Sequence, residues 1–398
     1  MNPWPADGEE PPKADGASVR GVTRPGYAAF ILLGWMSLLG PSLIREIERE
    51  FDQSDAGIGL VYLLGSLAFV VGSLGVGVVV VRVGRGMVML AAAALIGAGL
   101  LAEGTAPTWA IYVLGAVLAA VGSGAIEAAL NALFLDLFQT GRGGGLNRLH
   151  LCFSIGALTA PMVVGWLVTA GVGWRLFLVA AAVAALAVAA PLGTTGRVPV
   201  RRPGPGTERG QGPGRTLPAA PMIALAVAIG CYVAAEMGVS SWLVRFLAAE
   251  PLSVATFALG LFWTGLALGR LLSIRLADRH DLVVYGSSGA FLGALALAVA
   301  VLGPGGWLTV ALFGLTGLAF GPIYPVIMAV AGGFYPARAS SVAGILTTAA
   351  VVGSIVYPPA VGLASATVGL GAGMVGAIGL SVCSGLAVVA AGRAARQG

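Results

Sequence analysis

The sequence predicts an all-α membrane protein with twelve transmembrane helices arranged in two similar six-helix halves. Three observations predict this fold: the composition, the number of long apolar stretches, and a match between the two halves of the chain. Of the 398 residues, 58% are hydrophobic and only 10% are charged, whereas a soluble domain has about 25% charged residues. This number of charged side chains is too small to cover the surface of a soluble protein of this size. We therefore expect the chain to lie in a lipid bilayer.

The number of spans follows from hydropathy. A helix that crosses a bilayer needs about 20 mostly apolar residues. The segments that satisfy this requirement are 26–44, 57–81, 87–104, 108–138, 149–170, 174–192, 220–248, 254–277, 282–302, 306–333, 341–364 and 368–391. They predict a polar N-terminal tail (1–25), a first bundle (26–192), a linker (193–219), a second bundle (220–391) and a C-terminal tail (392–398).

The parts outside the spans support this division. Residues 1–25 are polar and lack the apolar core of a cleavable signal peptide. Residues 193–219 are rich in Gly, Pro and Arg and nearly free of large apolar side chains. Such a composition is typical of a flexible linker, so we expect it to join six spans to six.

Basic residues orient the predicted helices. If the N-terminus is cytoplasmic, most of the 22 Lys and Arg residues fall in inner loops and tails. The exceptions are Arg45, Arg49, Arg175 and Arg245, which fall outside, and Arg270, which lies within a span. The positive-inside rule therefore predicts a multi-pass protein of the cytoplasmic (inner) membrane with both termini in the cytoplasm. Because topology explains the basic balance, we expect no nucleic acid as a partner.

The two halves share short motifs at an offset of six helices. The run 156–165 in the fifth span has Gly, Pro and Gly at steps of five and four, and the run 353–362 in the eleventh span repeats these steps. Two further matches, between spans four and ten and between spans one and seven, pair 124–127 with 321–324 and 41–45 with 241–245. The matches in register predict two pseudo-symmetric halves.

Proteins of the major facilitator superfamily consist of two such halves and bind substrate at the midplane between them. The sequence resembles that superfamily over 26–391. The loop after the second span is similar to the signature Gly-x-x-x-Asp-Arg-x-Gly-Arg, with Val81 in place of the acid. The resemblance implies the major facilitator fold and loops that brace the inner gate by charge pairing. The matching loop residues are Arg82, Arg85, Asp278 and Arg279.

Glu127 is the most informative charge in the predicted spans. An ionisable group near the bilayer centre costs about 2.5–3.5 kcal/mol on insertion scales and usually faces a cavity or a partner. Glu127 lies near the middle of the apolar stretch 115–138, and Asn131 follows on the same face of the helix. Removal from water favours a neutral carboxyl group, which suits reversible protonation, and the ionised form accepts hydrogen bonds from sugar hydroxyl groups. The alternative is a polar network that only joins helices.

Two more ionisable residues lie inside predicted spans. Glu236 is in the seventh span, where we expect Arg45, Arg245 or water to pair with it. Arg270 in the eighth span is a candidate counter-charge to a substrate or to the acid of the fourth span, and snorkelling to the inner interface is the alternative. Asp136, at the inner end of the fourth span, is expected to face a loop.

A longer pattern resembles one branch of the superfamily, the fucose/glucose–proton symporters. Residues 146–158, together with Glu127 and Asn131, carry this resemblance, and Glu236 followed by a Trp-Leu pair adds to it. The resemblance implies proton-driven sugar uptake in which Glu127 and Asn131 contact sugar or proton. Some members have a coupling acid in the first span, but 31–44 contains none. Coupling would then rest on Glu127 or Glu236.

Aromatic residues near polar or proline positions are candidates for stacking on a sugar. We single out Trp242, Trp263 and Tyr324, although interfacial belts and ordinary packing are alternatives. The prolines near Tyr324 and at 358–359 predict interruptions of the tenth and eleventh helices, because proline removes a backbone hydrogen bond. Such interruptions would serve as hinges, or as fixed kinks.

These features predict a secondary active transporter that moves a small polar solute, most simply a sugar, by alternating access with proton coupling. The alternatives are an exporter of drugs or hydrophobic metabolites and a transporter-like membrane sensor. We expect no enzyme, because the sequence offers no metal-ligand cluster, nucleophile–base pair or phosphate loop. The expected partners are a small-molecule substrate, protons and the lipid bilayer, with no cofactor or metal, and the expected state is a monomer.

Overall fold

The computed structural model describes residues 16–137, 142–194, 219–276, 279–303 and 305–397, and over these residues it consists of helices joined by short connections. Twelve helical segments are long and apolar enough to cross a membrane, which confirms the predicted fold class. Large apolar side chains such as Leu74 and Leu302 lie exposed on the outside of the molecule, each with 72% of its surface accessible. A soluble protein would bury such side chains, whereas a lipid-facing surface requires them.

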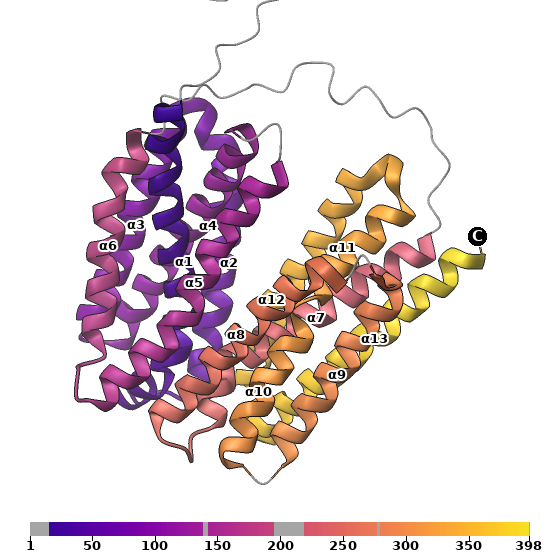
Figure 1. Ribbon diagram of the computed structural model, residues 1–398. Helices are drawn as coiled ribbons and strands as arrows, with labels where there is room; N and C mark the ends of the chain where they lie inside the picture. Colours follow the sequence, from indigo (N-terminus) through magenta and orange to yellow (C-terminus); the bar gives the residue numbers. More distant parts are fainter. Residues whose placement is uncertain (1–15, 138–141, 195–218, 277–278, 304, 398) are drawn as a thin grey trace, which may run out of the picture.

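The first half of the chain forms one helical bundle (Figure 1). Its helices are α1 (Gly16–Phe51), α2 (Asp55–Val83), α3 (Arg85–Thr105), α4 (Trp109–Leu137), α5 (Arg142–Thr169) and α6 (Arg175–Gly193). Ser54 begins α2 by accepting a hydrogen bond from the backbone N–H of Gly57 at 3.4 Å, as an N-cap residue does.

The second half forms the other bundle. Its helices are α7 (Ala219–Phe246), α8 (Leu252–Leu276), α9 (Leu282–Leu302), α10 (Gly306–Phe320), α11 (Ile323–Phe334), the short 3-10 helix η3 (Pro336–Arg338), α12 (Ala339–Val368) and α13 (Leu370–Gln397). Helices α10 and α11 together make one span. Most of the predicted linker, 195–218, lies outside the described residues.

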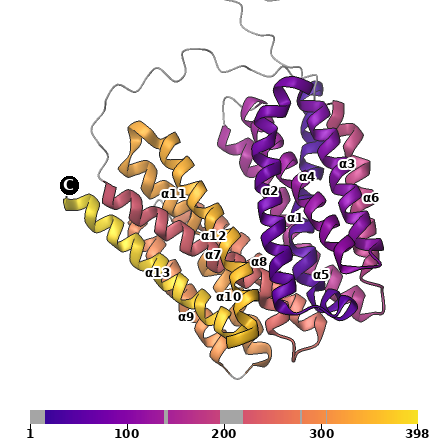
Figure 2. The same ribbon diagram turned by 180° about the vertical axis from the view of Figure 1, so that it is seen from behind.

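The two bundles lean on each other at one end and diverge toward the other (Figures 1 and 2). They meet through α2 with α12, α5 with α8, and α1 with α7. We call the end that holds the last turns of α1 and α7 the closed end, and the end that holds the start of α7 the open end. The basic residues that were predicted to lie outside, Arg45 and Arg245 among them, are at the closed end.

The repeated glycines occupy equivalent places in the two halves. Gly156 of α5 lies against the backbone of α1 at the Ile31 carbonyl, and Gly353 of α12 lies against the backbone of α7 at the Gly230 carbonyl. Any side chain at either glycine would overlap that backbone. The later glycines of the motif, Gly165 and Gly362, face α8 and α2 across the interface between the halves. The repeat read from the sequence is therefore a repeat of helix contacts.

The prolines act differently in the two spans where interruptions were predicted. The tenth span is interrupted at Gly321 and Pro322, between α10 and α11, as predicted. The eleventh is not, because α12 continues through Pro358 and Pro359, so that prediction was wrong. Inside a bilayer a broken helix would leave polar backbone groups without water, so a helix keeps its remaining hydrogen bonds around a proline.

Several helices extend past the predicted spans. Helix α1 begins at Gly16, inside the predicted N-terminal tail, and continues to Phe51 through the charged run 45–50. Helix α13 likewise runs to Gln397, through most of the predicted C-terminal tail. Hydropathy marks the part of a helix that lies in hydrocarbon, and it says little about where a helix with polar ends stops.

Candidate functional site

A cavity of about 450 Å³ lies between the two halves. Its wall comes mainly from α1, α2, α3 and α4, and α7 and α12 of the second half close one side. Cavities that hold small molecules have volumes of about 300–1,000 Å³. We call it the central cavity, and it is large enough for a small solute.

Polar groups line the central cavity among many apolar ones. Its two acids, Glu103 and Glu127, come from α3 and α4. Its hydroxyl groups belong to Ser37, Tyr62, Ser66, Tyr112, Ser123, Ser241 and Ser354. Within the described part of the chain, no Arg, Lys or His side chain lines it. The charged side chains that reach the cavity are therefore acidic.

Glu127 lines the central cavity, and no described basic side chain forms an ion pair with it. Asn131 follows one turn toward the open end and lies outside the cavity wall. The Asn131 Oδ1 atom is buried and has no hydrogen-bond partner among the described residues. The acid and the amide are thus neighbours on α4 as predicted, and the acid alone contacts the cavity.

Glu103 is a second cavity acid, which the sequence analysis missed. Its residue surface is only 7% exposed, and its carboxyl group lies near the side chain of Tyr112. Glu103 lies near the end of a predicted span, where a charged residue is expected at the membrane interface. In the structure α4 and α6 both pack on α3, and Glu103 is buried. The overlooked signal was Gly99, four residues earlier on the same face, because glycine-containing faces of membrane helices are usually packed.

Glu236 and Arg270 form an ion pair within the second half. The Arg270 Nη2 atom lies 3.2 Å from the Glu236 Oε1 atom, and Glu236 is only 4% exposed. Our expectation that Arg45 or Arg245 would pair with Glu236 was therefore wrong, because both arginines lie at the closed end. Neither member of the pair lines the central cavity, and the partner of Arg270 is Glu236 rather than Glu127.

None of the three aromatic candidates lines the central cavity. Trp242 is fully buried, and its indole N–H donates a hydrogen bond to the Pro358 carbonyl at 2.9 Å. Trp263 is 6% exposed and its ring centroid lies 6.4 Å from that of Phe153. Tyr324, on α11, also lies outside the wall. The aromatic rings that do line the cavity belong to Tyr62, Phe69, Tyr112 and Phe153.

Charged residues join the halves at the closed end. The Arg245 Nε atom of α7 lies 2.8 Å from the Glu48 Oε2 atom of α1 and 3.0 Å from the Asp55 Oδ1 atom of α2. Arg45 of α1 donates hydrogen bonds to carbonyl oxygens in the last turn of α7 and just after it, those of Val244, Leu247 and Glu250. We call Arg45, Glu48, Asp55 and Arg245 the closed-end seal. The two arginines were predicted to lie at this end, whereas neither acid was.

Loss of Arg245 is expected to open the closed end. In Arg245→Gln, Glu48 and Asp55 lose their shared cation, which costs about 1 kcal/mol for a partly exposed pair and raises the open population about five-fold. The measurement is the distance between spin labels at Ala170→Cys and Ala249→Cys, two exposed loop positions in opposite halves, with the three native cysteines replaced by serine. The control is Arg49→Gln, because among the described residues Arg49 forms its ion pair with Glu46 of its own helix. Equal distances in both variants would contradict the role of the seal.

One residue of the signature loop at the open end forms an ion pair with α4. Arg85 is buried, and its Nη2 atom lies 2.6 Å from the Asp136 Oδ2 atom of α4. Asp136 thus pairs with Arg85 within the first half, whereas we had expected it to face a loop. Arg82 and Arg279 are exposed, and Asp278 lies outside the described residues.

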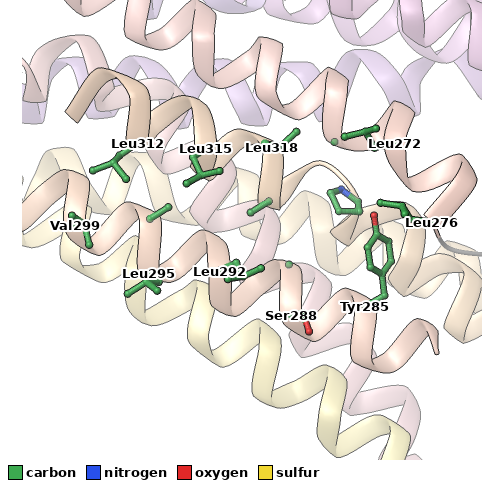
Figure 3. Close-up of a pocket in the computed structure, with 15 residues that line it drawn as sticks. Leu272, Leu276, Tyr285, Ser288, Leu292, Leu295, Val299, Leu312, Leu315 and Leu318 are labelled. Atoms are coloured by element: carbon green, nitrogen blue, oxygen red, sulfur yellow. The ribbon is translucent and has the colours of Figure 1, made fainter. Parts of the chain in front are cut away.

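A second cavity, of about 600 Å³, lies on the outer side of the second half between α8, α9 and α10. Figure 3 shows leucine side chains of these helices pointing into it, with Tyr285 and Ser288 toward one end. A surface of this kind offers a polar solute few partners and suits contact with acyl chains. The central cavity is therefore the candidate functional site.

Comparisons with known proteins agree with this fold. A family model described as "Major Facilitator Superfamily" matches residues 26–358, whereas no curated protein matches the chain. Among solved structures, a bacterial homologue of the human lysosomal transporter Spinster, in an inward-facing and occupied conformation, has a TM-score of 0.74 at 16% identity, with 97% of this chain and 98% of that chain covered.

Two further structures are similar. The same Spinster homologue in an inward-facing and unoccupied conformation has a TM-score of 0.71 at 16% identity, covering 98% of both chains. A mutant of the nucleoside transporter NupG has a TM-score of 0.70 at 15% identity, covering 94% of this chain and 99% of that one. At such low identity these likenesses bear on the fold alone.

Proposed function

Because the chain belongs to the major facilitator superfamily and is thus a secondary transporter, we propose that it moves a small polar solute, most simply a sugar, through the central cavity in symport with protons. The observation that carries the proposal is Glu127, an acid in the cavity wall with no described ion-pair partner. An acid so placed gains and loses a proton without breaking a structural ion pair.

The lining supports a hydroxylated solute. Seven hydroxyl groups from α1, α2, α4, α7 and α12 line the cavity, and the oxygen of each can accept a hydrogen bond from a sugar hydroxyl group. None of the similar structures above is described as a fucose or glucose symporter, so the sugar assignment rests on the lining and on the sequence resemblance. The rival assignment, export of apolar compounds, draws on the leucine and isoleucine side chains that share the wall.

In the proposal, the charges orient the structure in the membrane. The positive-inside rule puts the open end in the cytoplasm, and the halves meet at the opposite end through the closed-end seal. On this orientation, the structure faces inward, as the two Spinster homologue structures do by their descriptions. Uptake then requires the seal to open and the solute to enter from the closed end.

The proposal predicts gradient-driven accumulation of a monosaccharide. Proteoliposomes that contain the full chain are supplied with an inward proton gradient and a mixture of labelled monosaccharides. We expect accumulation that disappears when a protonophore removes the gradient. Extrusion of a loaded apolar dye without sugar accumulation would favour the exporter instead. Sugar accumulation that is unchanged by the protonophore would overturn proton coupling.

A further inference from the structure

Glu103 lies at the closed end of the central cavity. It has no part in the proton coupling that we propose for Glu127. The residue is 7% exposed and lines the cavity from the last turn of α3. Its polar neighbour is Tyr112 of α4, and none of the ion pairs between described residues includes it. The cavity wall thus holds a buried acid without a described cation.

Close contact between α3 and α4 makes the room for this acid. A Cβ atom at Gly115 of α4 would lie 2.9 Å from the Glu103 Cγ atom and 2.8 Å from the Glu103 backbone nitrogen. The missing side chain at Gly115 therefore lets the Glu103 stem pass between the two helices, with its carboxyl group in the cavity wall. Burying a carboxylate without a counter-charge is unfavourable, so a cationic ligand would stabilise the ionised form.

The surroundings of Glu103 suit a positive charge. Both acids of the cavity wall add negative potential, and no described basic side chain in that wall offsets it. The ring of Tyr62 also lines the cavity, and aromatic faces attract cations. An ammonium group has three N–H donors and no acceptor, which matches a carboxylate in a wall that also holds an aromatic ring.

We propose that Glu103, with Tyr112 beside it, forms an ammonium-binding subsite, so that the transported solute is a hydroxylated amine such as an amino sugar. This inference rests on the proposed function and gives the solute a charge. The ammonium group binds Glu103 at the closed end, the serine hydroxyl groups bind the rest of the solute, and Glu127 stays free to carry the coupling proton.

The test compares the binding of amines with the binding of their uncharged N-acetyl derivatives. Binding to the purified full chain is measured by calorimetry for D-glucosamine and 2-amino-1,3-propanediol, and for the N-acetyl derivative of each. Because a hydrogen bond to a charged group contributes about 1.5–3 kcal/mol, we expect an amine to bind at least ten-fold more tightly than its derivative. In Glu103→Gln we expect this ratio to fall to about one.

Two further variants separate the subsite from a structural role. Tyr112→Phe should lower amine affinity with little change for the N-acetyl derivatives, and Glu103→Asp, which keeps the charge, should retain a preference for amines if Glu103→Gln fails to fold. Equal binding of amine and derivative by the wild-type chain would overturn the subsite. So would an unchanged ratio in Glu103→Gln, or the absence of binding by both amines.

Failure of this inference can be told apart from failure of the proposed function. In the proteoliposome assay, proton-driven accumulation of D-glucose but not D-glucosamine would overturn the subsite and leave proton-coupled sugar uptake standing. Accumulation of D-glucosamine that ignores the proton gradient would overturn proton coupling and support the subsite.

Discussion

The variant Glu127→Gln is expected to lose gradient-driven accumulation entirely while it still binds and exchanges solute. Glutamine has nearly the shape of glutamic acid and keeps hydrogen-bonding capacity, but it cannot gain or lose a proton. Since Glu127 lines the cavity without a described ion-pair partner, its replacement leaves no charge unpaired. The fold should therefore survive and the coupling should not.

The measurement pairs two transport modes in the same proteoliposomes. Accumulation under an inward proton gradient should fall to the protein-free background in Glu127→Gln, and exchange of labelled for unlabelled solute should continue without dependence on pH. Glu250→Gln is the matched control. Glu250 contacts Arg45 of the closed-end seal through its backbone carbonyl, and the substitution leaves that carbonyl in place. Unchanged pH dependence in Glu127→Gln would show that the coupling proton binds elsewhere.

The largest effect on stability is expected from Gly353→Ala, since a Cβ atom there would overlap the Gly230 carbonyl of α7. Helices α7 and α12 must then move apart, and overpacking of this kind costs about 1–3 kcal/mol or more. Gly344→Ala is the control on the same helix, because a Cβ atom there meets nothing within 4 Å. Alanine favours a helix by about 1 kcal/mol over glycine, so the control should unfold at the same temperature or slightly higher.

Thermal unfolding of the purified protein checks this expectation. Gly353→Ala should lower the unfolding temperature by several degrees. Gly156→Ala should do the same, because Gly156 lies against the Ile31 carbonyl in the equivalent contact of the first half. If Gly353→Ala and Gly344→Ala unfold at one temperature, the close approach of α7 and α12 contributes little to stability.

The fold was predictable because lipid imposes a strict rule on the sequence. Each span must be long and apolar, so the number of helices and the division into halves could be read from hydropathy and from the repeated motifs. Glu127 was also predictable, because a carboxyl group in the middle of an apolar stretch needs a reason to be there. For Glu127, position along the helix was sufficient information.

Contacts between helices could not be read in this way. The partner of Arg270 depends on how α7 and α8 are rotated toward each other, and hydropathy does not determine that rotation. Glu48, Asp55 and Glu103 lie near helix ends, where charged residues are common and usually solvated. Only the packing of neighbouring helices shows that Glu103 is buried and that Glu48 and Asp55 share Arg245.

The environment of Trp242 gives the protein an internal optical signal. The indole ring is fully buried, and the ring of Tyr62 from the other half lies perpendicular to it at a centroid distance of 5.6 Å. Separation of the halves at the closed end would move Tyr62 away from Trp242 and expose the indole ring to water. This exposure would shift the fluorescence emission of Trp242 to longer wavelength. A chain that retains Trp242 and replaces the other seven tryptophans would therefore report each opening of the closed end in real time, without an attached dye.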